Sequence, residues 1–118
     1  MIMKIDAIVR EEKFEGVKNA LMEIEVNGLT VSQVMGCGLQ RGYKEIVRGM
    51  EVEPQMQPKV KFEIVVSSEE WAEKTIEAIK KAAYTGEYGD GKIFSYPVAS
   101  ATKIRTGETG YDAVQCQE

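Results

Sequence analysis

The chain contains no histidine, and that absence removes several kinds of chemistry at once. Histidine supplies the base of the usual serine and cysteine triads, the commonest zinc ligand and the imidazole that exchanges protons at neutral pH. The two cysteines, Cys37 and Cys116, are too few for a metal cage, and in a reducing compartment we expect thiols rather than a bridge. Many classes of enzyme are therefore excluded for this sequence.

Positive charge and long apolar runs are scarce as well. The 15 basic and 19 acidic side chains give a formal net charge of −4, whereas a nucleic-acid surface needs a basic face. No apolar run approaches the roughly 20 residues of a membrane span, and the first residues lack the pattern of a signal peptide. We expect a cytoplasmic protein that binds no nucleic acid, formed of a single domain over residues 1–118.

The apolar pattern predicts four strands and two helices. Alternation or β-branched residues indicate the strands, and spacings of three and four indicate the helices. The strands are expected at residues 3–9, 29–34, 60–66 and 92–98, and the helices at residues 11–24 and 67–83. Asn27-Gly28 and Gly86 are the expected helix stops, and Ser67 with Glu70 form a candidate capping box. Residues 101–106 are expected to be extended and to precede a polar tail.

The order β-α-β-β-α-β in about 100 residues is typical of a ferredoxin-like α+β fold. In that arrangement two helices cover one face of a four-stranded antiparallel sheet, and the other face stays open. Ile8, Ile64 and Val66 indicate apolar character on parts of both faces. We therefore predict self-association through the open face.

A long segment, residues 38–58, joins the second and third predicted strands. A hairpin needs only about 2 to 5 residues, and longer connections are usually functional or disordered. Its mixed charges, together with Tyr43 and Arg48, suit folding onto a partner, the alternative being an insertion without a role.

Two further segments could hold an anion. In residues 85–92, TGEYGDGK, the glycines permit close backbone approach and Lys92 adds a charge, although a helix stop with a turn explains this segment equally. The topology and the missing Ser or Thr argue against a true P-loop. Residues 103–107 place two cations on a predicted final strand, whose alternative interpretation is a solvated edge. Gly38 and Gln40 lie at the mouth of the long segment, which is expected to reach the same sheet end as residues 85–92. The glycines and lysines of these two loops are expected to converge on a polyphosphate there.

The segments GLTVSQVMGCGLQRGYKEIVRG, PKVKFEIVV, KAAYTGEYGDGKIF and KIRTGE resemble the nitrogen regulatory PII signal-transduction family, in that family's order and over nearly the whole chain. The resemblance implies a cytosolic homotrimer that binds ATP or ADP in clefts between subunits. In many members, ATP with Mg²⁺ then allows 2-oxoglutarate to bind. It also implies that the long loop docks on an ammonium channel or on a nitrogen-metabolism enzyme or regulator such as glutamine synthetase, so that contact with a membrane is only indirect.

The resemblance also implies roles for individual residues. Gln40 would ligate Mg²⁺ and help to hold 2-oxoglutarate, whose carboxylate would pair with Lys59. In the partner-binding loop, which includes Tyr43, Arg48 matches the arginine that enters a channel pore. The residues implied for nucleotide binding, with the last two coming from the neighbouring subunit, are Thr30, Gly38, Glu63, Val65, Gly86, Gly89, Asp90, Gly91, Lys92, Lys103 and Arg105.

Three positions depart from the family pattern. Leu39 stands where many members carry an Arg or Lys that touches the phosphates, and Arg41 is a candidate substitute. Val52 and Met50 stand at the positions of the tyrosine and serine that are modified in some members. Neither modification is possible at those two positions.

Two other classes of protein share this fold. An acylphosphatase-like enzyme needs an arginine and an asparagine around phosphate, but the asparagines here are Asn19 and Asn27, on the first helix and at its end. An RNA-recognition module needs aromatic residues on the central strands, for which Phe62 and Phe94 are the candidates. The sequence favours a regulatory binding protein over both alternatives.

Overall fold

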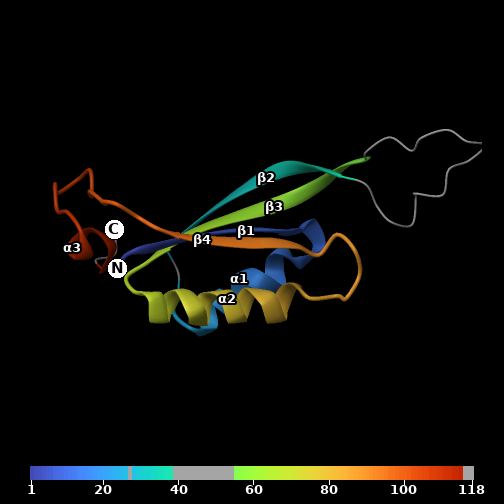
Figure 1. Cartoon of the computed structure of the whole chain (residues 1–118), viewed down its shortest axis with the longest axis horizontal. Coiled ribbons are helices and arrows are strands. Elements are labelled where there is room, and N and C mark those ends of the chain that lie inside the picture. Colours follow the sequence, from blue (N-terminus) through green and yellow to red (C-terminus); the bar gives the residue numbers. More distant parts are fainter. Residues whose placement is uncertain (27, 39–54, 116–118) are drawn as a thin grey trace, which may run out of the picture.

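The computed structural model describes residues 1–26, 28–38 and 55–115. The elements, in chain order, are β1 (Met3–Arg10), η1 (Glu11–Lys13), α1 (Phe14–Glu23), β2 (Leu29–Gly38), β3 (Gln55–Val66), α2 (Glu69–Ala83), β4 (Gly91–Pro97) and α3 (Tyr111–Gln115). The four strands form one antiparallel sheet in the order β2-β3-β1-β4. Both α1 and α2 lie on one face of it (Figure 1). The predicted α+β arrangement is confirmed.

The core forms between this helix pair and the sheet. Alternate residues of β1 and β3 face the helices and pair across the strands, as in Ile5 with Ile64 and Ala7 with Phe62. Phe14 of α1 stacks on Phe62 with ring centroids 5.8 Å apart. The buried apolar residues of both helices recur with the helical periodicity that predicted them. The buried apolar residues of the core are Ile5, Ala7, Val9, Val17, Leu21, Val26, Val60, Phe62, Ile64, Val66, Ala72, Ile79 and Ala83.

This alternation corrects the expected composition of the open face. Ile64 and Val66 lie on the buried face, because side chains alternate with period two and both share the parity of Phe62. Ile8 lies on the open face as expected, together with Val65, which is 38% exposed, and Phe94, which is 51% exposed.

The helix ends differ by one to several residues from the prediction. Ser68, not Ser67, caps α2: its backbone is extended and its hydroxyl accepts a hydrogen bond from the Trp71 N–H at 3.1 Å. Helix α1 ends at Glu23, and Glu25 takes the left-handed conformation with φ 65°, so the chain turns before Gly28 is reached. The start of α2 is therefore set by the Ser68 cap, and α1 ends before its predicted stop at Gly28 is reached.

Strands β2 and β3 are longer than predicted, and they pair as far as Gly38 and Gln55. The predicted loop 38–58 is thus wrong at both ends, and its remainder, residues 39–54, lies outside the described residues together with Gln40, Tyr43 and Arg48. Strand β1 stops pairing at Arg10 with Lys59, so the two strands continue alone as an arm. Without a core beneath it, the arm needs no apolar alternation, and a proline is tolerated where one strand edge has no neighbour.

The C-terminal segment is not the extended strand predicted at residues 101–106. Thr102 and Thr109 form an isolated bridge, and the chain reverses between them with Gly107 at φ 78°. The short helix α3 follows where a polar tail was expected. We call residues 102–110 the C-terminal turn. In the described ranges, no helix has the length and apolar character needed to cross a membrane.

Candidate functional site

One carboxylate organises residues 85–91, which connect α2 to β4 and include the first residue of β4, and which we call the glycine loop. Asp90 Oδ2 accepts hydrogen bonds from the backbone N–H groups of Thr85, at 2.8 Å, and Gly86, at 2.9 Å. The Thr85 hydroxyl donates to Oδ1. These hydrogen bonds, led by that of the hydroxyl, hold the pKa of Asp90 well below its usual range. The carboxylate acts as a built-in anion around which the loop closes.

Two cations from neighbouring strands converge on this loop. Arg10 donates from Nε to Asp90 Oδ1 at 3.0 Å and from Nη2 to the Tyr88 carbonyl at 2.7 Å. Lys59, which is directly opposite Arg10 in the β1–β3 register, donates from Nζ to the Gly89 carbonyl. The charge of Arg10 is thus balanced by Asp90, whereas the hydrogen bond of Lys59 goes to a neutral group.

The environment of Lys59 disfavours the charged form of its side chain. Burial, followed by the nearby positive charge of Arg10, lowers the pKa of the Lys59 ammonium. An anion placed beside both cations would relieve this repulsion, because an opposite charge within a few ångströms favours the charged form. The pair is therefore suited to a carboxylate or phosphate ligand.

Two glycines of this region are required by the backbone. Gly91 has φ 106°, and a Cβ there would lie 1.8 Å from the Ile8 carbonyl oxygen, so β4 crosses β1 too closely for any side chain. Gly89 has φ 101°, and a Cβ there would lie 3.3 Å from Arg10 Nη2 and 3.7 Å from Lys59 Nζ. Gly89 is thus the point around which both cations gather.

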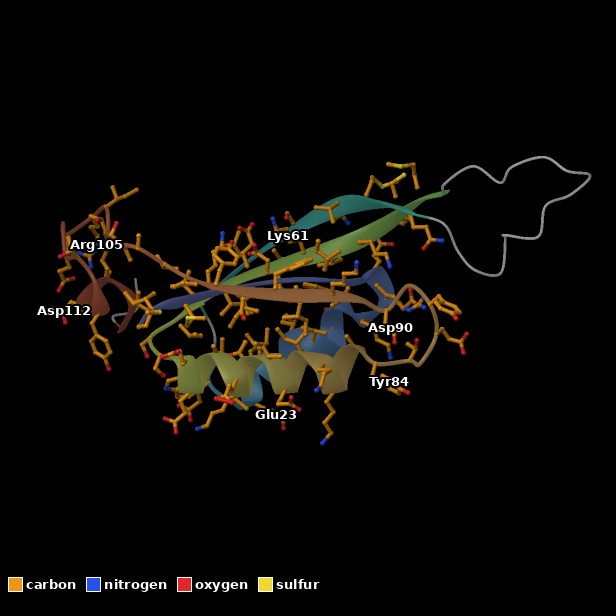
Figure 2. The ribbon with its side chains drawn as sticks, in the orientation of Figure 1. Glu23, Lys61, Tyr84, Asp90, Arg105 and Asp112 are labelled. Carbon is orange, nitrogen blue, oxygen red and sulfur yellow. The ribbon has the colours of Figure 1, made fainter. Side chains whose placement is uncertain are left out.

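The open face of the sheet beside the glycine loop is basic. Lys61 and Lys92 both oppose Ile8, on either side of β1, and therefore lie on the face away from the helices. Figure 2 shows Lys61 on this open side of the sheet. Together with Arg10 and Lys59, these residues give one end of the sheet a positive potential that attracts anions.

Three of the residues implied for nucleotide binding lie toward the other end of the same face. Thr30 pairs with Glu63, and Val65 lies two residues further along β3. Lys4 Nζ donates to Glu63 Oε1 at 2.9 Å, and this hydrogen bond raises the pKa of Lys4. These three residues are therefore separated from the glycine loop by several strand residues. Gly38, at the end of the arm, is on the loop side.

The two predicted C-terminal cations also lie at that far end. Figure 2 shows Arg105 and Asp90 at opposite ends of the sheet. Strand β4 alone separates the two regions by about 20 Å, at 3.3 Å per residue. The Lys103 ammonium lies 3.7 Å from Glu108 Oε1 with its side chain 4% exposed, whereas Arg105 is exposed. One chain therefore does not bring these cations to the glycine loop.

Sequence reasoning missed Arg10 as a site residue. The available signal was its parity, because Lys4, Asp6, Ile8 and Arg10 continue one face of β1. Among the described residues, no group of three Cys, Asp or Glu side chains could hold a metal ion. The predicted Mg²⁺ ligand Gln40 lies outside them.

Comparisons with known proteins agree over nearly the full length. The family model for nitrogen regulatory protein P-II matches residues 2–108. Nitrogen regulatory protein P-II 1 of Methanothermobacter thermautotrophicus is 51% identical over 111 residues, covering 94% of this chain and 96% of that protein. A structure of the B. subtilis GlnK–ATP complex has a TM-score of 0.77 at 38% identity and covers 95% of this chain and 96% of that one. A crystal structure of Arabidopsis thaliana PII bound to citrate has a TM-score of 0.77 at 37% identity, covering 99% and 93%.

Proposed function

Because the chain belongs to the nitrogen regulatory protein P-II family, we propose that it binds ATP or ADP in sites shared between subunits of a homotrimer. The protein is a nitrogen-regulatory signal transducer. The observation that carries the proposal is the division of the predicted nucleotide residues between opposite ends of one sheet. A site that needs both groups is completed only when a second copy brings its C-terminal turn to the glycine loop of the first.

In this proposal the glycine loop and Lys92 hold the phosphates. Gly86, Gly89 and Gly91 have positive φ, which permits the close approach of the backbone to an anion, and Lys92 is the second residue of β4. Lys103 and Arg105 of the neighbouring copy add charge. Thr30, Glu63 and Val65 form the adenine side, and Gly38 backs the nucleotide. The ATP complex of a protein with 38% identity and a TM-score of 0.77 supports the choice of nucleotide.

A second ligand, 2-oxoglutarate, is proposed for Lys59 and Arg10. Two adjacent cations of which only one is balanced by a carboxylate suit an added carboxylate group. The citrate complex of the plant relative supports a multiply charged carboxylate as a ligand class. Gln40 is proposed to hold Mg²⁺, which prefers oxygen ligands and would supply positive charge for the bound anions.

The alternatives have less support from the residues in hand. Asn19 lies on α1, on the helix side of the sheet, so among the described residues no asparagine lies at the glycine loop for acylphosphatase chemistry. Asn27 is outside those residues. Phe62 is fully buried, which removes one of the two aromatic candidates for RNA stacking. We propose that residues 39–54, with Tyr43 and Arg48, contact an ammonium channel or a nitrogen-metabolism protein in the cytoplasm.

Calorimetry with ATP and ADP, each with and without Mg²⁺ and 2-oxoglutarate, tests the proposed ligands. We expect both nucleotides to bind, and 2-oxoglutarate to bind only when ATP and Mg²⁺ are present. Sedimentation velocity of the same samples is expected to give a single trimeric species. A monodisperse monomer would contradict the proposal, as would the failure of both nucleotides to bind.

A further inference from the structure

The C-terminal turn encloses a cation instead of presenting it. The Lys103 side chain is 4% exposed, although an ammonium group removed from water is strongly unfavourable unless it is paired. Its charge partner is Glu108, whose Oε1 lies 3.7 Å from Lys103 Nζ. The turn therefore contains an ion pair whose ammonium is buried and whose carboxylate is 42% exposed.

Backbone hydrogen bonds join the same two residues. The Lys103 N–H donates to the Glu108 carbonyl at 2.8 Å, and the Gly107 N–H donates to the Lys103 carbonyl at 2.8 Å. The Thr106 hydroxyl donates to Glu108 Oε1 at 2.9 Å, which orients the carboxylate that faces the ammonium. A further bond, from the Gly110 N–H to the Ala101 carbonyl at 2.8 Å, closes the base of the turn. Side-chain pairing and backbone closure thus support each other.

The neighbouring residues have the opposite environment. Ile104 is 98% exposed and Arg105 is exposed at the tip of the same turn. Lys103 and Arg105 are only two residues apart, yet Arg105 is exposed whereas the Lys103 side chain is 4% exposed. In this conformation an external phosphate reaches the Lys103 ammonium only if the turn opens.

We infer that Glu108 sets the affinity for nucleotide by competing with its phosphates for Lys103. This inference rests on the proposed function, in which Lys103 serves the site of a neighbouring copy. With the turn closed, Glu108 holds the ammonium, and with the turn open, the phosphates replace the Glu108 carboxylate. Nucleotide binding is thereby coupled to opening of the C-terminal turn, because the ligand prefers the open state.

The primary test is the substitution Glu108→Gln in the full chain, with ATP binding measured by calorimetry. We expect Glu108→Gln to bind ATP about fivefold more tightly than the wild type, which is a modest coupling between two states. The matched control is Glu73→Gln, which removes one acidic charge from an exposed position on α2 and is expected to leave the affinity unchanged. Amide exchange at Gly107 and Gly110 is expected to be faster in Glu108→Gln before ATP is added.

A second variant and a double-variant cycle keep the inference separable from folding and from general charge effects. Thr106→Val keeps the Glu108 charge but removes the hydroxyl that orients it, and we expect a smaller gain in ATP affinity. In a Lys103→Ala background, Glu108→Gln is expected to give no gain. Unchanged or weaker binding in both single variants would overturn the inference, as would an equal gain without Lys103. A wild-type chain that binds no ATP would contradict the proposed function instead.

Discussion

The glycine loop and the C-terminal turn lie at opposite ends of β4 and use the same chemistry with opposite results. Each reverses the chain with glycines at positive φ, and each closes around one carboxylate, Asp90 in the loop and Glu108 in the turn. Asp90 accepts backbone N–H groups of its own loop, and Lys59 stays beside a neutral carbonyl. Glu108 instead pairs directly with Lys103 and keeps it buried. The placement of the carboxylate decides whether a nearby cation is available to a ligand.

The largest effect is expected from glycine substitution, which tests the two turns as backbone structures. Gly91→Ala places a Cβ 1.8 Å from the Ile8 carbonyl oxygen at φ 106°, and strain with overpacking should lower the free energy of unfolding by about 3 kcal/mol or more. Gly107→Ala meets no atom within 4 Å and carries only the cost of φ 78°, about 1 kcal/mol. Urea unfolding of both variants measures the difference, and equal losses would contradict the account.

The next effect concerns the carboxylate of the glycine loop. Asp90→Asn weakens several charge-assisted hydrogen bonds, so we expect a loss of about 2 kcal/mol in unfolding free energy at neutral pH. Because the pKa of Asp90 is lowered in the folded state, its contribution is present above about pH 4 and is lost as the pH falls further. The difference in unfolding free energy between the wild type and Asp90→Asn should therefore be larger at pH 7 than at pH 3. Glu87→Gln, exposed in the same loop, is the control expected to change neither value.

A smaller effect, confined to ligand binding, is expected at the cation that the loop leaves available. Lys59→Met should weaken binding of 2-oxoglutarate, in the presence of ATP and Mg²⁺, by about tenfold or more, the usual scale for a charged hydrogen bond. Lys61→Met removes the same charge two residues along the same strand and face, and is expected to have little effect. In the wild type, binding should weaken as the pH rises through the lowered pKa of Lys59. Equal losses in both variants would show a general charge effect.

The smallest effect on ligands is expected outside both segments. Ser68→Ala removes the hydroxyl that accepts the Trp71 N–H at 3.1 Å, and this should lower the free energy of unfolding by about 1 kcal/mol. Ligand affinities measured by calorimetry should not change, which shows that a loss of stability alone does not imitate the site variants. A change of ATP affinity in Ser68→Ala would remove that reference.

The helix and sheet layers could be predicted well from the sequence, because burial recurs at every second residue of a strand and at every third or fourth residue of a helix. The apolar spacing of Val17 and Leu21 and the alternation around Ile5 correspond to residues that are buried in the core. The long arm was missed because Gln55 and its neighbours satisfy backbone hydrogen bonds without a core. Glycine positions such as Gly89 were predicted by motif. Arg10 was not, because its role depends on the register that places it beside Lys59. The burial of Lys103 was not predicted, because it depends on a turn that no local sequence pattern indicates.

Subunit mixing tests the central claim, that each nucleotide site joins the glycine loop of one copy to the C-terminal turn of another. Lys92→Ala and Arg105→Ala each damage one half of that site and are expected to bind ATP weakly as separate homotrimers. When both chains are co-expressed with different tags and the mixed trimers are purified, we predict that one site per trimer regains wild-type ATP affinity by calorimetry. If mixed trimers bind as weakly as their parents, each site lies within one chain and the account is wrong.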